Sequence, residues 1–335
     1  MATPTTNEPE KTMLSFGFTK KNIIRLITNE GMGAFLILMG FTIVLSIASD
    51  YFFTANNLTN MLRQSSWYIM IAMGGLCVFI IGQIDLSLGA VMGMSGIVSA
   101  ILAQESVGTP VVVIVLVAMG IGVVLGAING YLVGYLGMSS FIVTLGMMTS
   151  IRGAILLPTG GYPVNNLQES FNAIGTSYFF GIPSPVYIMA VICMITWYIL
   201  NKTPFGRHMY ATGGNTQAAQ YSGIDTKRIT FFTFVYSGLV SGISGMVLTA
   251  RLSSGQLSLG TGFELDAIAG LVIGGISMEG GKGKVFGSIC GMLVMIVLKN
   301  GMDLLNISPY WQKVVQGVII VIAVLMDTMR KRQKA

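Results

Sequence analysis

The chain has 335 residues, of which only 10% are charged while 53% are hydrophobic and 43 are glycine. A soluble domain carries about 25% charged residues, so this composition excludes an ordinary water-facing globule, and it equally excludes a disordered, collagen-like or disulfide-rich chain. The net charge of +6 would indicate a nucleic-acid partner only if the basic residues formed one patch, which they do not.

Long runs without charge dominate the chain, and a membrane-spanning helix needs about 20 mostly apolar residues. In chain order such runs cover 31–49, 64–84, 86–104, two spans within 106–151, 185–201 and 229–250. The glycine-rich stretch 134–140 divides the run 106–151. Three stretches that contain charges complete a prediction of ten spans: 265–278, 285–305 and 311–326. The predicted fold class is an all-α polytopic membrane protein.

The basic residues predict the orientation of these spans. With the N-terminus inside, ten spans place residues 1–30, 202–228, 279–284 and 328–335 in the cytoplasm, and these segments hold 14 of the 19 Lys and Arg residues. Cytoplasmic loops are enriched in Lys and Arg, so both termini are predicted to be cytoplasmic. The first 30 residues lack the apolar core of a cleavable signal peptide.

The predicted organisation is therefore a cytoplasmic N-terminal segment (1–30), a transmembrane domain (31–327) that contains a cytoplasmic loop (202–228), and a basic tail (328–335). Small residues recur within two of the spans and allow helix backbones to approach closely in lipid. The glycines of these two series are Gly120, Gly122, Gly126, Gly130 and Gly134, then Gly238, Gly242 and Gly245. They predict a tightly packed bundle.

Catalytic and metal-binding patterns are not found in the sequence. Cys77, Cys193 and Cys290 lie in separate apolar runs, and His208 is the only histidine, so no standard zinc site is expected. The stretch 280–284, GGKGK, lacks the first glycine and the final Ser or Thr of a phosphate-binding loop. We read it as a tight turn, and we expect neither an enzyme activity nor a cofactor in this chain.

A few polar residues within the spans are candidates to line a pathway, because polar groups in a bundle face its interior. These candidates are Gln64, Ser65, Asp85, Asn129, Thr144, Arg152 and Asn300. For Asp85 there is an alternative to the pathway interpretation, namely a structural role in which Asp85 caps the helix that follows it. For Arg152 the competing interpretation is that its side chain extends to the outer interface. Glu264 and Asp266 open a span, where acids complement the helix dipole.

The loop 202–228 contains a short predicted helix. Asn215 is a suitable N-cap and Gly223 occupies the position of a C-terminal glycine. About seven residues lie between them, roughly 10 Å of helix, which is marginal in water because nucleation is costly. The helix therefore needs a surface to dock on. It presents Ala218 and Ala219, which suggests a partner protein; the alternative is that it folds back on its own bundle.

Several longer stretches, taken together, resemble one known family. The chain resembles the permease subunits of bacterial ABC importers for monosaccharides, of the ribose, galactose and xylose type, over about residues 50–328. The stretches that carry this resemblance are 52–58, 85–89, 140–146, 206–224, 250–254, 264–269 and 280–283. One departure is Gln83, where the family usually has glycine.

The resemblance implies a homodimer in the bacterial inner membrane, surrounded by lipid, with the pathway between two copies of the chain. It also implies an external sugar-binding protein and a cytoplasmic ATPase with two nucleotide domains, which binds ATP and Mg, while no nucleic acid is involved. The ATPase-coupling residues that it implies are Gly206, Arg207, Gly213, Gly214, Asn215, Ala218, Ala219 and Gly223. Ribose is favoured as the sugar, although specificity in this family comes largely from the binding protein.

Two other classes of function are alternatives to a passive permease subunit. A self-contained proton-coupled sugar carrier needs titrating groups deep in the bilayer, whereas the predicted spans place the carboxylates near their ends: Asp50, Asp85, Glu264, Asp266 and Asp303. A membrane-embedded enzyme needs clustered His, Cys or acidic residues, which the sequence lacks. An importer of the same type for galactose, xylose or another small polar solute stays open.

Overall fold

The computed structural model describes residues 31–332, so the predictions for residues 1–30 and 333–335 lie outside the described residues. The elements in chain order are α2 (Met32–Ala48), α3 (Ala55–Ile80), α4 (Leu88–Leu102), α5 (Val111–Gly134), α6 (Ser140–Thr159), α7 (Glu169–Thr176), β1 (Tyr178–Phe179), β2 (Ile182–Pro183), α8 (Ser184–Lys202), α9 (Pro204–Gly214), α10 (Thr216–Tyr221), α11 (Thr226–Leu252), α12 (Phe263–Ile273), α13 (Val285–Leu304) and α14 (Pro309–Arg332).

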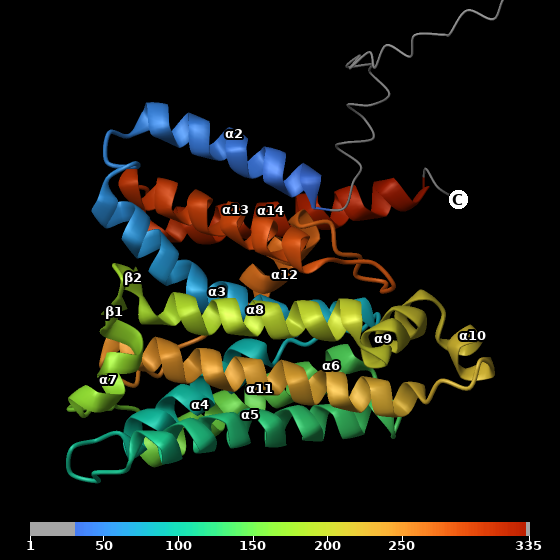
Figure 1. The fold of residues 1–335 in the computed structure, drawn as a ribbon, viewed down its shortest axis with the longest axis horizontal. Coiled ribbons are helices and arrows are strands. Elements are labelled where there is room, and N and C mark those ends of the chain that lie inside the picture. The colour runs from blue at the N-terminus through green and yellow to red at the C-terminus, as the bar shows by residue number, and fades with distance from the viewer. Residues whose placement is uncertain (1–30, 333–335) are drawn as a thin grey trace, which may run out of the picture.

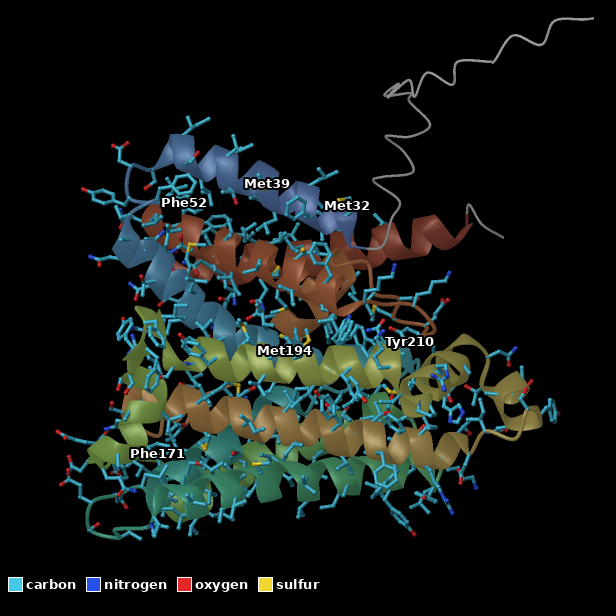
Figure 2. The ribbon with its side chains drawn as sticks, viewed as in Figure 1. Met32, Met39, Phe52, Phe171, Met194 and Tyr210 are labelled. Carbon is cyan, nitrogen blue, oxygen red and sulfur yellow. The ribbon has the colours of Figure 1, made fainter. Side chains whose placement is uncertain are left out.

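The long helices form one elongated bundle (Figure 1). Helices α2, α13 and α14 make one side of it, α4, α5 and α11 make the other, and α3 and α8 lie between them. The short helix α7 and the β1–β2 hairpin lie at one end, where Phe52 and Phe171 are buried (Figure 2). At the opposite end α9 and α10 project from the bundle (Figure 1). The bundle thus has two structurally different ends.

Several of these helices have the length and composition of membrane spans. Within residues 31–332, five helices are long and apolar enough to cross a membrane, namely α5, α6, α8, α11 and α13, and α2 and α4 are shorter apolar helices. The predicted break at 134–140 lies where α5 ends and α6 begins. The prediction of a helical polytopic membrane protein is confirmed.

Helix α3 is the central helix of the bundle. All of its residues from Ser65 to Ile80 are buried, which is typical of a helix that is covered on every side. It packs against α11, α13, α8 and α12. A substitution in this half of α3 therefore meets protein on every face rather than lipid.

Glycine sets the distance between α5 and α11. A methyl group built at Gly122 or Gly126 would overlap the backbone of α11, and one built at Gly238 would overlap the Gly122 carbonyl oxygen. The predicted packing role of these glycines is confirmed. Gly120 is different, because a methyl group there has no neighbour within 4 Å in the described part of the chain. The prediction of a packing role is wrong for Gly120, because this residue lies on another face of α5.

Two stretches of non-helical backbone are wholly or partly buried in the bundle. One is 81–87, between α3 and α4, and the other is 253–262, between α11 and α12. The start of α4, which follows the first stretch, lies against the second, because a methyl group built at Gly89 would overlap the Gly260 carbonyl oxygen. Irregular backbone inside a membrane bundle needs internal hydrogen-bond partners.

Candidate functional site

The Asp85 corner, which we define as residues 82–87 with the side chains that bind them, is a buried polar cluster. Asp85 is 4% exposed. Its Oδ1 accepts hydrogen bonds from the Ser87 amide (2.9 Å) and hydroxyl (2.6 Å), and its Oδ2 accepts from the Ser237 hydroxyl of α11 (3.0 Å). The carboxylate therefore joins the start of α4 to α11.

Side chains from α5 and α6 complete this corner. Asn129 donates through Nδ2 to the Ser87 hydroxyl (2.9 Å). The hydroxyls of Ser140 and Thr144 accept from the amides of Ile84 (3.2 Å) and Leu86 (3.0 Å). These bonds satisfy backbone donors that no helix satisfies, which is the requirement inside lipid. The structure thus brings together three predicted pathway candidates, Asp85, Asn129 and Thr144, as a support for the turn between α3 and α4.

We expect Asp85→Leu to destabilise the permease by about 2–4 kcal/mol, because it leaves the Ser87 amide and the Ser237 hydroxyl without acceptors inside the bundle. Asp85→Asn keeps one oxygen as an acceptor, and its amide group can donate a hydrogen bond to the Ser237 hydroxyl. We therefore expect a much smaller loss of stability. Thermal unfolding of the purified protein in detergent measures both. Equal effects of the two variants would show that these hydrogen bonds do not stabilise the corner.

The other pathway candidates lie elsewhere. The Ser65 hydroxyl donates to its own helix at Leu62 (2.8 Å), and Gln64 is half-buried. Asn300 of α13 exchanges two amide hydrogen bonds with Asn57 of α3 (2.7 and 3.0 Å). These residues therefore do not converge with the Asp85 corner on one channel inside a single copy of the chain.

Arg152 of α6 binds the non-helical stretch 253–262. Its Nη1 donates to the Leu259 carbonyl (2.8 Å), and its Nη2 is buried. The expectation that this side chain extends to the outer interface is wrong, because the guanidinium points into the bundle. The sequence does not reveal this hydrogen-bond partner of Arg152, because the acceptor is a backbone oxygen of Leu259, 107 residues further along the chain.

A buried ion pair joins three helices. Lys299 of α13 pairs with Asp266 of α12, which is 2% exposed. The Asp266 Oδ1 also accepts from the Gln316 amide of α14 (2.6 Å), and the Lys299 ammonium lies 5.0 Å from the centroid of the Tyr68 ring. Asp266 lies in the first turn of α12, as expected, but it acts through this network and not only on the helix dipole.

The carboxylates lie near helix ends, as predicted: Asp85 lies between α3 and α4, and Glu264 and Asp266 lie in the first turn of α12. Asp85, Glu264 and Asp266 are all buried among helices. Helix α12 has only 11 residues, about 16 Å of helix, against a hydrocarbon core of about 30 Å. Glu264 and Asp266 in its first turn are buried by neighbouring helices, which the sequence did not predict.

The segment α9–α10 is the most distinct feature of the projecting end. Asn215 caps α10 through a bond from the Ala218 amide to its Oδ1 (2.9 Å), and Gly223 has φ +83°. The predicted helix is therefore present, with six residues. Helix α9 was not predicted, although Thr203 accepts from the Gly206 amide (3.1 Å) as its N-cap. Thr203 followed by Pro204 is a helix-start signal that could have revealed it.

Close backbone contacts fix α9 to the bundle. A methyl group built at Gly213 would overlap the Ile80 carbonyl oxygen at the end of α3. That oxygen accepts from the Gly281 amide (2.9 Å). The hydroxyl of Tyr210, which is labelled in Figure 2, donates to the Gly283 carbonyl (2.7 Å). The turn 280–284 is therefore also the support on which α9 lies, and Gly213 is required for the close approach.

The two alanines of α10 differ in exposure. Ala218 is exposed, as are Arg207, Gly214 and Asn215, and Tyr221 is 91% exposed. Ala219 is only 4% exposed and packs toward its own chain. The expectation that Ala219 is presented to a partner is wrong. With six residues, α10 has one face on the bundle and one in solvent, and only the structure decides which alanine lies on which face.

A bundle of long apolar helices, with polar turns inside it and a docked segment projecting from one end, indicates a polytopic membrane protein. The chain belongs to the family described as the branched-chain amino acid transport system / permease component, whose model matches residues 57–324. It is a multi-pass inner-membrane permease, in agreement with the resemblance found in the sequence.

Individual relatives cover most of the chain. The ribose import permease protein of Haemophilus influenzae is 40% identical, over 90% of this chain and 93% of its own length. The ribose import permease protein of Bacillus subtilis is 42% identical, over 89% and 92%, and the D-allose transport system permease protein of Escherichia coli is 38% identical, over 85% and 87%. No solved structure matches the chain significantly.

Proposed function

We propose that this chain is the translocation-pathway subunit of an ATP-driven importer that moves a monosaccharide, with ribose favoured, across the inner membrane. The observation that carries the proposal is the similarity, over about nine-tenths of both chains, to two ribose import permeases. D-allose, xylose and galactose are the alternative sugars, because transport proteins for each of them are also among the relatives.

The proposed assembly contains two copies of the chain, a cytoplasmic ATPase that binds ATP and Mg, and an external sugar-binding protein. Two observations support a pathway between copies rather than within one. Ser65 and Asn300 do not converge with the Asp85 corner inside a single copy. Helix α6 also leaves Thr149 and Ser150 exposed, on a face with the small residues Gly146 and Gly153, which suits contact with a second copy or with a polar solute.

The proposed topology has ten spans, with both termini and the α9–α10 segment in the cytoplasm. The basic residues support it, since Lys202, Arg207, Lys227 and Arg228 all belong to or flank this projecting end. The exposed face of α10, with Ala218 and Tyr221, is then the surface on which the ATPase docks. The α9–α10 segment rests on α3 through the contact at Gly213. Movement of the ATPase would therefore be transmitted through this contact to α3 and to the Asp85 corner.

We expect Ala218→Arg to abolish sugar uptake and to weaken ATPase association by roughly a hundredfold, because it buries an unpaired charge in the contact. Ala218 is exposed in the free chain, so the variant folds. Co-purification of the ATPase and uptake of labelled ribose in the same cells measure the two effects. The matched control is Ser106→Arg, which adds the same charge to an exposed loop outside the α9–α10 segment.

Three outcomes decide between the readings. Normal ATPase binding and uptake by Ala218→Arg would refute docking on α10. Uptake that continues without the ATPase would identify a self-contained carrier. If unlabelled allose, xylose or galactose inhibits the uptake of labelled ribose more strongly than unlabelled ribose does, that sugar is the preferred substrate instead of ribose.

A further inference from the structure

An apolar cavity of about 310 Å³ lies where α8, α9 and α11 meet, near the end of the bundle from which α9 and α10 project. Figure 1 shows α8 and α11 running alongside each other, with α9 at the end of α8. We call this hollow the α8–α11 cavity. Cys77 of α3 and Met209 of α9 lie behind it and are buried.

The accessible wall of the cavity is made of large apolar and aromatic side chains. Ile199 of α8, Phe205 of α9 and Tyr236 of α11 are partly exposed, and Phe232 of α11 is 53% exposed. None of the described residues that line the cavity is charged. A ligand that approaches from outside the bundle therefore meets an apolar surface formed by three helices.

The polar groups of the lining are already hydrogen-bonded. The Thr233 hydroxyl donates to the Ile229 carbonyl (2.7 Å), and the Tyr236 hydroxyl is hydrogen-bonded to the Thr196 hydroxyl (2.6 Å). A buried water needs two to four polar partners, which this lining does not offer. The cavity therefore does not hold water, and leaving it empty would cost its walls their van der Waals contacts.

The surface beside the cavity is one that lipid covers. Helices α8 and α11 are both long and apolar enough to cross a membrane. Side chains on the outer surface of α8 are apolar and exposed, among them Val191, Met194 and Ile195. Hydrocarbon chains of the bilayer thus lie next to the opening, and an acyl chain is the group that can fill a dry apolar cavity there.

Positive charge lies at the edge of the cavity. Lys202 ends α8, lies in the chain between Ile199 and Phe205, and is exposed. Its ammonium group lies 5.6 Å from the centroid of the Trp197 ring, and Trp side chains are enriched at the level of lipid headgroups. No carboxylate among the described residues forms an ion pair with Lys202.

A second cation lies on the other side of the opening. Arg228 is one turn before Phe232 on α11, so the two side chains share a face of that helix. Arg228 is exposed and pairs with Asp225 (2.9 Å). An exposed pair of this kind contributes little to stability, so its guanidinium group can also bind an anion.

We propose that the α8–α11 cavity binds one anionic phospholipid from the leaflet next to the α9–α10 end. One acyl chain lies against Ile199, Phe205 and Phe232, and the phosphate group binds Lys202, with Arg228 as a second contact. Basic pockets between transmembrane helices bind anionic headgroups in this way. The site depends neither on the identity of the sugar nor on the ATPase.

Binding of this lipid has a consequence for α9. The acyl chain contacts α8, α9 and α11 together, through the walls of the cavity. A ligand stabilises the state that it binds better, so the lipid holds α9 against the bundle. We expect hydrogen exchange of the backbone amides of α9 to be slower in phosphatidylglycerol nanodiscs than in phosphatidylcholine nanodiscs. Equal exchange in the two lipids would overturn this role.

The test of the headgroup measures which lipid the full chain retains. The purified protein is equilibrated with equal amounts of phosphatidylglycerol and phosphatidylcholine that carry the same acyl chains, and native mass spectrometry counts the bound lipids. We expect one phosphatidylglycerol to be retained in preference. Lys202→Gln is expected to lower this preference about fivefold. The matched control is Lys282→Gln, which removes the same charge from an exposed position in the turn 280–284.

The test of the acyl chain fills the cavity. Ile199→Trp places a large side chain in the wall, and we expect it to abolish the preferential retention. Met194→Trp is its control, because Met194 lies on α8 outside the cavity and is 61% exposed. Glycerol 1-phosphate carries the headgroup phosphate without acyl chains, so we expect that it does not displace the retained lipid even in large excess.

Four outcomes would overturn the proposal. The first is equal retention of phosphatidylglycerol and phosphatidylcholine by the unmodified chain. The second is an equal loss of preference in Lys202→Gln and Lys282→Gln, and the third is an equal effect of Ile199→Trp and Met194→Trp. The fourth is displacement by glycerol 1-phosphate, which would identify a site for a free phosphate instead of a lipid and which does not depend on the folding of any variant.

Discussion

Gly238→Leu is expected to leave almost no folded permease in the membrane. Gly238 lies in α11, where a single methyl group would already overlap the carbonyl oxygen of Gly122 in α5 and crowd the backbone of Gly126. Overpacking usually costs about 1–3 kcal/mol because side chains can shift. Here the obstacle is backbone, so α5 and α11 must separate. We expect a loss above about 3 kcal/mol.

The control for this substitution is Gly120→Leu. It places the same side chain on α5, two residues from Gly122, but at a position with open space in the described structure. We expect this variant to accumulate at the normal level and to transport. The amount of permease in detergent-extracted membranes, followed by size-exclusion chromatography, compares the two. A folded Gly238→Leu protein at normal yield would show that α5 and α11 do not depend on this close contact.

Breaking the Asp266–Lys299 pair is expected to destabilise the permease by about 3–5 kcal/mol, because removal of one partner leaves the other charge buried and unpaired. Asp266→Asn leaves the Lys299 ammonium group, and Lys299→Met leaves a carboxylate that is 3% exposed. The double variant Asp266→Asn with Lys299→Met has neither charge. We expect it to be more stable than either single variant, which is the signature of a directly coupled pair.

Unfolding of the purified proteins in detergent gives the three free energies of this cycle. Asp303→Asn is the matched control, because Asp303 also lies on α13 but is exposed, and its carboxylate accepts a hydrogen bond from the Gln312 amide (2.8 Å). We expect its effect to be below about 1 kcal/mol. Strictly additive effects of the two single substitutions would mean that Asp266 and Lys299 do not stabilise the bundle as a pair.

The sequence alone determined the class of protein, because the features that define it are local. Length and apolarity of the runs predict spans regardless of their neighbours, and the break between α5 and α6 follows from glycines within six residues. The capped helix α10 follows from Asn215 and Gly223, which act on their own backbone. The family resemblance likewise depends on short contiguous motifs.

Only the tertiary structure decided which groups act together, because those contacts join residues far apart in the chain. Ser237 binds Asp85 from 152 positions away, and Lys299 meets Asp266 from 33. The tertiary structure also decided which face of a helix packs against its neighbour. Gly120 and Gly122 belong to one glycine pattern, yet of these two only Gly122 packs on α11. Ala218 and Ala219 are adjacent and identical, and their exposure differs because a helical step turns one of them toward the bundle.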